Sequence, residues 1–464
     1  MILESVRQQL TRWGDTVRAH RDPSRPPVVG WHIPFLGCGL RFGRGGPAWL
    51  RDQHARRGSP FTLYMLGRTV TLAQDPEFMQ HFYTAKLDEV SFLEALATLP
   101  GIADVVDMNS TGPEWDNAGL EALRTWLPPR VTGAGEALDA EMKLALAEAL
   151  AGGRGDVMQV MTRTIVRLTA LLLTSERLAH DAGFIADVCA FDVASTRLIK
   201  NPYARGVVRE ALALRDRAVA RIVAELERRR EGDGEPGFLD VMLGLRDREG
   251  QPFGLTALAT AMHGYMFATT ANTPATASMC LLHILADPGL KRRVDDELAA
   301  ARRAHGEAIG GAALKAMPLL NAVYHEVLRR YVGPFHLRMT LTPMTVGPYT
   351  LPARSMIGFS AYILHHDPAV YTDPMVFDPD RFLAGPRGPG KPPSSAHWLP
   401  YGKGVHTCLG RNLARQEILL AVARLLRDYE VTLEPGKDPL AVDFMTNGIA
   451  APAGPRGVRV RPRA

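Results

Sequence analysis

Residues 397–426 read HWLPYGKGVHTCLGRNLARQEILLAVARLL. Cys408 lies in a loop with three glycines, Gly402, Gly404 and Gly410, which permit positive φ angles and a close approach of the backbone. The amphipathic stretch that follows is predicted to form a helix, whose unpaired N–H groups at its start would stabilise a thiolate. From these residues alone, Cys408 is either a metal-binding or reactive thiolate or a buried apolar cysteine.

The composition is that of an ordinary globular protein. The chain has 464 residues, of which 46% are apolar and 22% charged, and this excludes wholesale disorder. The net charge of +5 is small and dispersed, so it gives no reason to expect a nucleic-acid partner. The four cysteines lie far apart without a CxxC pair, so neither a disulfide framework nor a zinc knuckle is expected; they are Cys38, Cys189, Cys280 and Cys408.

Nothing in the sequence predicts a membrane span or a leader. No run reaches 18 consecutive apolar residues, and residues 1–22 lack the apolar core of a signal peptide. We therefore expect a soluble, cytoplasmic protein.

The periodicity predicts a mainly α fold with small β-sheets. In chain order we expect an irregular entry at 24–42, a hairpin at 61–73 that turns at Gly67 and Arg68, helices over about 134–302 with one long helix at 255–286 interrupted by Pro274, a loop at 303–314, a helix at 316–331, short strands at 336–359, an irregular stretch at 384–395, a helix at about 409–428 and short strands at 429–464.

Two further motifs precede the cysteine loop. In YHEVLRRY (324–331), Glu326 and Arg329 share one helix face and can pair. FDPDRF (377–382) offers Arg381 as a second cation for the same carboxylate. Each motif alone is weak, because such pairs are common on solvated helices, but their order and spacing relative to Cys408 are specific.

Together these motifs resemble the haem-thiolate cytochrome P-450 family. The cysteine loop matches the family pattern of an aromatic residue, Gly, Cys and Gly through Tyr401, Gly404, Cys408 and Gly410, with Tyr401 in place of the usual Phe. The hairpin at 61–73 and PPVVGWHIPFLG (26–37) are similar to the N-terminal region of the family. The resemblance implies a single cytochrome P450 domain over 1–464, with a β-rich part at about 26–75, a helical core at about 110–430 and a C-terminal β-turn region at 431–464.

The resemblance also implies a cofactor and roles for particular residues. Haem b would be held with Cys408 as the axial ligand of its iron, and Glu326, Arg329 and Arg381 would form a structural triad. Haem propionates need cations or donors. The family positions for this role fall on His406 and Arg338. A third position, four residues after Trp115, is Gly119 here, and Arg124 is the candidate replacement.

The long helix with the sequence HGYMFATTANTPATASMC (263–280) matches the distal helix of the family. Thr273 takes the place of the alcohol that donates a hydrogen bond to dioxygen. Asn272 takes the place of the usual acid, and an amide can orient water but cannot relay a proton as an acid does. Pro274 lacks an N–H, so we expect an opening in the helix at the carbonyl group of Thr270. Without the cysteine loop, this stretch of small residues would indicate helix packing alone.

The string ATTANTPAT (268–276) resembles the subgroup of sterol 7α-hydroxylase and prostacyclin synthase, and residues 26–68 are similar to sterol 14-demethylases. Family substrate contacts fall on about 91–109, on Gly333 to Leu337 and on Phe444 to Ile449. These segments are mainly apolar, with His336 and Asn447 as candidate polar anchors, and so favour a lipophilic substrate.

We therefore expect a bacterial monooxygenase that inserts one oxygen atom from O₂ into a steroid, terpenoid, fatty acyl or polyketide-like substrate. No reductase module is visible, so electrons would come from a separate ferredoxin or flavodoxin with its reductase, docking near Lys403, Arg411 and Arg415. One alternative is a haem-thiolate isomerase or dehydratase that rearranges a lipid peroxide without an electron donor. A non-catalytic haem sensor is disfavoured by the intact Thr273.

Overall fold

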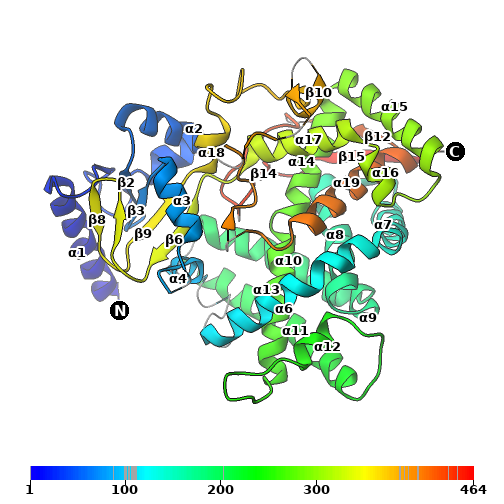
Figure 1. Cartoon of the computed structure of the whole chain (residues 1–464), viewed down its shortest axis with the longest axis horizontal. Helices are drawn as coiled ribbons and strands as arrows, with labels where there is room; N and C mark the ends of the chain where they lie inside the picture. The colour runs from blue at the N-terminus through cyan, green and yellow to red at the C-terminus, as the bar shows by residue number, and fades with distance from the viewer. Residues whose placement is uncertain are drawn as a thin grey trace. The chain divides into compact units, whose positions relative to one another are not determined.

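The computed structural model describes most of the chain in two compact units (Figure 1). Unit 1 is formed by residues 1–98, 329–377 and 392–408, and unit 2 by residues 99–328, 378–391 and 409–464. The described residues are 2–86, 88–98, 102, 105, 112–201, 203–385, 388–390, 392–394, 397–404, 407–436, 438–446 and 448–463.

Unit 1 is built on a six-stranded sheet in the order β1-β2-β3-β9-β6-β4. Its strands are rich in apolar side chains, and Phe61, Leu63 and Leu72 are fully buried. β2 pairs antiparallel with β3, and β3 pairs parallel with β9, so the first hairpin and a late segment of the chain share one sheet. The strands are β1 (Val28–Val29), β2 (Phe61–Met65), β3 (Arg68–Leu72), β4 (Val90–Ser91), β6 (His336–Thr340) and β9 (Met356–Phe359).

The turn of the β2–β3 hairpin lies one residue before the predicted turn at Gly67 and Arg68. Met65 pairs with Arg68, so Leu66 and Gly67 form the two-residue turn, with φ angles of 51° and 75°. Two positive φ angles are what a tight hairpin requires. Leu66 gave no signal for this conformation, because non-glycine residues seldom adopt it.

Helices surround this sheet, including two that were not predicted, α1 and α2, the second of which begins within the expected irregular entry. Figure 1 shows α1 beside the strands. The helices of unit 1 are α1 (Ile2–Arg21), α2 (Gly39–Arg57), α3 (Pro76–Thr84), α4 (Phe92–Ala97) and α18 (Ala361–His365), and a small hairpin joins β7 (Met344–Val346) to β8 (Tyr349–Leu351).

Unit 2 is mainly helical, as the periodicity predicts. Its helices are α6 (Gly112–Gly133), α7 (Gly135–Ala149), α8 (Val157–Leu173), α9 (Glu176–Ala179), α10 (Ala182–Lys200), α11 (Arg205–Arg230), α12 (Phe238–Leu243), α13 (Leu255–Thr270), α14 (Thr273–Ala286), α15 (Pro288–His305), α16 (Gly311–Lys315), α17 (Pro318–Tyr331, in which the residues from Arg329 on belong to unit 1) and α19 (Arg411–Asp428).

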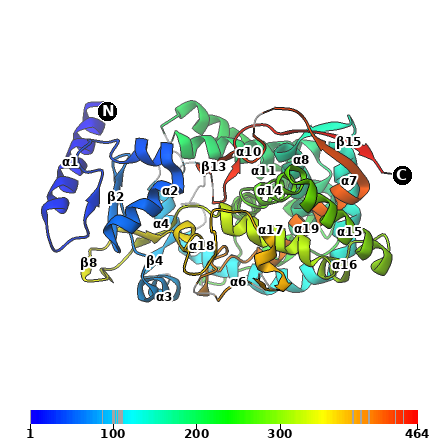
Figure 2. The ribbon, with the colours of Figure 1, turned by 90° about the horizontal axis from the view of Figure 1, so that it is seen from above.

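The centre of unit 2 is α14. Every residue from Thr273 to Ile284 is buried, as expected of a helix that is apolar all round. α14 packs against α8 and α19, and Figure 2 shows α8 and α14 close together. Since α19 starts three residues after Cys408, the segment that follows the cysteine loop is fixed in this core.

Small β elements complete unit 2. β12 (Tyr429–Leu433), β15 (Gly457–Pro462) and β5 (Arg154–Asp156) form an antiparallel sheet. Two short hairpins pair β10 (Ala384–Gly385) with β11 (Gly388–Pro389) and β13 (Val442–Asp443) with β14 (Ala451–Pro452), and a 3₁₀ helix η1 covers Pro379–Phe382.

Two expectations for unit 2 need correction. The segment 255–286 is two helices that meet at Ala271 and Asn272, and Pro274 lies in the first turn of α14, where its missing N–H costs little. The expected loop at 303–314 is shorter, because α15 continues to His305 and α16 begins at Gly311. Among the described helices, none is long and apolar enough to cross a membrane.

Candidate haem and oxygen site

The cysteine loop of unit 1 is closed by backbone hydrogen bonds. The N–H of Cys408 donates to the carbonyl oxygen of Tyr401 at 2.9 Å, and the N–H of Thr407 donates to that of Gly404 at 3.2 Å. Gly404 has a φ of 63°, and a Cβ there would lie 2.5 Å from the carbonyl oxygen of Tyr83. The loop can therefore pack on the end of α3 only with glycine at this position.

The other two glycines of the loop differ from each other. Gly402 has a positive φ of 69°. Gly410 has a φ of −80° and is the N-cap of α19, so its conformation does not require glycine. The prediction that all three glycines permit positive φ angles therefore applies to Gly402 and Gly404.

Cys408 differs from the other three cysteines in exposure. It is exposed, whereas Cys38 and Cys280 are buried and Cys189 is partly buried. Burial raises the pKa of Cys38 to about 11 and that of Cys189 to about 12, and it also raises the pKa of Cys280. These three thiols stay protonated at neutral pH, so they are poor candidates for a thiolate ligand.

Arg338, on β6 in unit 1, is a half-buried cation without a carboxylate partner among the described residues. Its guanidinium lies 5.2 Å from the ring of Phe82 and 5.3 Å from that of Phe92, and Nη1 donates to the carbonyl oxygen of Leu337 at 2.7 Å. Its Nε is buried and has no hydrogen-bond partner in the described chain. Burial lowers the pKa of Arg338 to about 10, so the side chain remains charged at neutral pH.

Tyr83 and His336 lie beside Arg338. The Tyr83 hydroxyl is 3.4 Å from Nδ1 of His336, and the His336 ring packs against Phe359 at 4.8 Å between centroids. Burial and then the charge of Arg338 lower the pKa of His336 to about 4, so this imidazole is neutral at neutral pH. His336 was considered as a polar anchor for substrate; the structure gives it partners within unit 1. No sequence signal pointed to Tyr83, because its contacts come from segments far away in the chain.

The distal segment lies in unit 2, where α13 ends and α14 begins. Thr273 is 4% exposed, and its side chain has no hydrogen-bond partner among the described residues. By contrast, the hydroxyls of Thr270 and Thr276 donate to the carbonyl oxygens of Phe267 and Asn272 at 2.9 Å each. The hydroxyl of Thr273 is therefore the one of these three that is available for a bound molecule.

Asn272 contacts the late turn of unit 2. Its Oδ1 accepts a hydrogen bond from the backbone N–H of Ile449 at 2.9 Å, and a Cβ on Gly448 would lie 2.7 Å from this oxygen. Ile449 and Gly448 belong to the Phe444–Ile449 turn, which was predicted to contact substrate. The structure thus shows Asn272 connecting the helix break to this turn, a contact that the sequence did not indicate.

Of the expected structural triad, Glu326 and Arg381 lie in unit 2 and Arg329 lies in unit 1. In unit 2, Glu326 is fully buried, its Oε2 lies 3.2 Å from Nε of Arg381, and Oε1 accepts from the backbone N–H of Asp378 at 2.9 Å. In unit 1, Arg329 donates to the carbonyl oxygens of residues 365, 374 and 376 at 2.8–3.2 Å. Both side chains on α17 therefore order the segments that lead to the cysteine loop.

Three of the predicted site positions lie wholly or partly outside the described residues. His406 and Asn447 lie outside the described residues, and so does the side chain of Trp115. Arg124, the candidate replacement on α6, is half-exposed and pairs with Glu121.

Comparison with known proteins identifies the family. A cytochrome P450 family model matches residues 186–460, which is more than half of the chain. The chain therefore belongs to the cytochrome P450 family.

Its relatives differ in how much of their length is matched. The mitochondrial 25-hydroxyvitamin D-1 alpha hydroxylase of Mus musculus is 34% identical over 166 residues, 36% of this chain and 32% of the relative. The match thus spans about a third of that protein. Cytochrome P450 monooxygenase poxD of Penicillium oxalicum is 27% identical over 451 residues, 91% of each chain.

A solved structure confirms the fold. Retinoic acid bound cyanobacterial CYP120A1 superposes with a TM-score of 0.75 and 21% identity, over 94% of this chain and 99% of that one. The prediction of a mainly α cytochrome P450 fold is therefore confirmed.

The cofactor of this family is haem b, and the residues of unit 1 fit it. Haem iron takes a cysteine thiolate as an axial ligand, and Cys408 is the exposed cysteine in a closed, glycine-dependent loop. Haem propionates need cations, and Arg338 is a half-buried guanidinium whose buried Nε has no hydrogen-bond partner among the described residues.

Proposed function

We propose that the protein is a haem-thiolate monooxygenase that inserts one oxygen atom from O₂ into a lipophilic substrate and releases the other as water. The observation that carries this proposal is that unit 1 contains both the exposed Cys408 and Arg338, a half-buried cation without a carboxylate partner among the described residues. When bound, haem supplies O₂ activation at an iron made electron-rich by the thiolate.

The residues of unit 2 support an oxygenase rather than a non-catalytic haem sensor. The free hydroxyl of Thr273 can donate a hydrogen bond to bound oxygen and hold a water molecule that delivers protons. Asn272 cannot relay a proton, and its amide oxygen is already occupied by the N–H of Ile449. Proton delivery is therefore assigned to Thr273 and water, and Asn272 to holding the late turn.

The substrate class is supported by the named relatives. One relative is named for a hydroxylation of 25-hydroxyvitamin D, and the similar solved structure is named for bound retinoic acid. Both compounds are lipophilic, in agreement with the apolar segments of this sequence. Within this class we favour sterol-like or oxygenated-lipid substrates, on the resemblance of residues 268–276 to the sterol 7α-hydroxylase and prostacyclin synthase subgroup. The bacterial origin and cytoplasmic location remain predictions from the sequence.

The first experiment tests the axial ligand. The reduced protein with carbon monoxide should absorb at the Soret position of thiolate-ligated haem, and Cys408→Ser should lose this band. The matched controls are the serine variants of Cys38, Cys189 and Cys280, which should keep it. Retention of the band in Cys408→Ser would refute the assignment.

The second experiment separates this function from the competing one, a haem-thiolate isomerase or dehydratase acting on a lipid peroxide. Asn272 at the acid position is the observation that favours the competitor. A monooxygenase should need NAD(P)H with a ferredoxin or flavodoxin and its reductase. Thr273→Ala should then divert electrons to hydrogen peroxide and lower product per NAD(P)H, within the 10²–10⁴-fold range of general acid–base effects. An isomerase would turn over without electrons and tolerate Thr273→Ala.

A further inference from the structure

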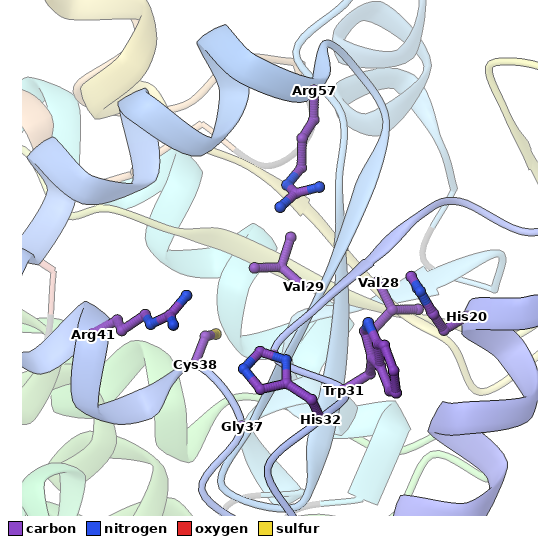
Figure 3. A pocket seen from close by; sticks show the side chains of 10 residues that line it. His20, Val28, Val29, Trp31, His32, Gly37, Cys38, Arg41 and Arg57 are labelled. Atoms are coloured by element: carbon purple, nitrogen blue, oxygen red, sulfur yellow. The ribbon is translucent and has the colours of Figure 1, made fainter.

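A small pocket in unit 1, separate from the residues assigned to haem and oxygen, is lined by four basic side chains (Figure 3). Its volume is about 100 Å³. The basic residues are His20, His32, Arg41 and Arg57, and among the described residues no Asp or Glu lines it. A pocket with two guanidinium cations and no carboxylate favours an anionic ligand.

Arg41 and Arg57, from opposite ends of α2, line one pocket because α2 is kinked. Arg41 and Arg57 are 16 positions apart, so a straight helix would separate their Cα atoms by about 24 Å. Gly46, with φ 54° and ψ −149°, breaks α2 immediately before Pro47, and both arginines line the same pocket. Figure 3 shows their guanidinium groups turned toward the space beside Cys38 and Val29. The glycine-rich sequence FGRGGPAW (42–49) therefore builds the pocket.

The other wall comes from the end of α1. His20 stacks on Trp31 with 4.5 Å between ring centroids, and Nε1 of Trp13 donates to the carbonyl oxygen of Trp31 at 2.8 Å. These contacts hold α1 in place at the pocket. Nδ1 of His20 is buried and has no hydrogen-bond partner in the described part of the chain.

The arginines are also available for a ligand. Arg41 makes no ion pair or hydrogen bond with a described residue, and the one side-chain contact of Arg57 is a long hydrogen bond of 3.5 Å from Nε to Gln53. Two guanidinium forks and two imidazoles offer donors from more directions than the two oxygens of a carboxylate can use. A tetrahedral oxyanion has more acceptor oxygens and can use donors from more directions.

We propose that this pocket binds a phosphate group, carried either by a small phosphate ester or by a phospholipid headgroup. The proposal is independent of the monooxygenase function, because the basic pocket residues have no role in that site. It is tested on the haem-loaded protein with inorganic phosphate and glycerol 3-phosphate, by titration calorimetry. We expect saturable binding of both probes at one site.

The variants assign the site. Arg41→Ala combined with Arg57→Ala should weaken binding by about tenfold or more, because both charge-assisted partners are lost. The matched control is Arg44→Ala combined with Arg56→Ala, two exposed arginines on the same helix outside the pocket, which should bind as the parent does. The carbon monoxide band shows that each variant is folded; if the double variant does not load haem, the single Arg57→Gln variant at the exposed helix end replaces it.

Vesicles distinguish the two sources of phosphate. Recruitment to phosphatidylcholine vesicles that contain phosphatidic acid, lost in the Arg41/Arg57 double variant, identifies a headgroup; binding of glycerol 3-phosphate without recruitment identifies a small ester. The proposal is overturned if neither soluble probe binds, or if binding is equal in the parent and the double variant.

Discussion

Glu417 is a carboxyl group in an unusual place, the buried face of α19. It is 1% exposed, and its Oε1 accepts a hydrogen bond from the Thr169 hydroxyl at 2.9 Å. Its Oε2 has no hydrogen-bond partner among the described residues, and burial raises the pKa of Glu417 to about 8. The side chain is therefore a neutral acid in the folded protein at neutral pH.

This burial makes stability depend on pH. Between the ordinary pKa of 4.5 and about 8, the folded protein holds a proton on Glu417 that the unfolded chain releases. The stabilisation is complete below that window and is lost as pH rises through it, at up to about 1.4 kcal/mol per pH unit. Denaturant unfolding measured from about pH 5 to about pH 8 tests this dependence. In this range the free energy of unfolding of Glu417→Gln should change less with pH than that of the parent. An unchanged slope would contradict the assignment.

Glu326 offers the contrasting case of a buried charge with partners. Glu326→Ala removes a buried carboxylate that contacts Arg381 and accepts from the N–H of Asp378, so we expect a loss of about 3–5 kcal/mol in the free energy of unfolding and little haem-loaded protein. The matched control is Glu121→Ala, which removes the exposed partner of Arg124 and should cost under about 1 kcal/mol. Equal effects of the two substitutions would show that the buried pair is not structural.

Local motifs could predict only part of the candidate site. Cys408, Glu326 and Arg381 are each recognisable within a few residues of sequence. Tyr83 beside Gly404, and Ile449 beside Asn272, are contacts between segments more than 170 positions apart, and no local pattern encodes them. The assigned roles of the site residues remain predictions until variants are measured.

The break between α13 and α14 is joined to the Phe444–Ile449 turn by one hydrogen bond. Asn272→Ala removes the acceptor for the Ile449 N–H, at a cost of about 1 kcal/mol. We expect substrate affinity to fall roughly fivefold and product distribution to broaden, because the turn is released. Asn272→Asp keeps an acceptor oxygen and should behave as the parent does. Substrate titrations and product analysis check both variants.

A double-mutant cycle sharpens this test. Gly448→Ala would place a Cβ 2.7 Å from Oδ1 of Asn272 and should disturb the same turn. In the Asn272→Ala background the clashing atom is gone, so the added methyl group should cost less. If the changes in substrate affinity caused by the two substitutions are strictly additive, Asn272 and Gly448 act separately.

Element types were more predictable than element ends. The helices of unit 2 follow from strong 3.6-residue periodicity, and α14 from its apolar composition. The break at Ala271 and Asn272 was placed at Pro274, because proline marks the first turn of a helix as readily as an interruption. α16 was missed, because a five-residue helix of Gly, Ala, Leu and Lys has too little length for a periodic signal.

The molecule as a whole carries a modest positive charge, with 54 basic and 49 acidic residues. If an acidic ferredoxin delivers electrons, its reduction of the haem should slow as ionic strength rises, since charges are screened over about 10 Å at 0.1 M salt. Arg411→Glu, at the exposed start of α19, should slow reduction by up to about tenfold at low salt. Arg303→Glu, on α15, is the control for net charge alone.

The two units are interleaved along the chain, which passes from unit 1 to unit 2 three times and from unit 2 to unit 1 twice. β15 pairs with β5, whose residues lie about 300 positions earlier. At roughly 5–20 residues per second, a ribosome needs on the order of 15–60 s to travel between these strands. During that interval β5 lacks its neighbour in the sheet, and α8 and α14 lack α19. Neither core can be finished during synthesis of the first 400 or so residues, because both units take residues from the end of the chain. We therefore expect haem capture at the proposed ligand, Cys408, to come late in biogenesis.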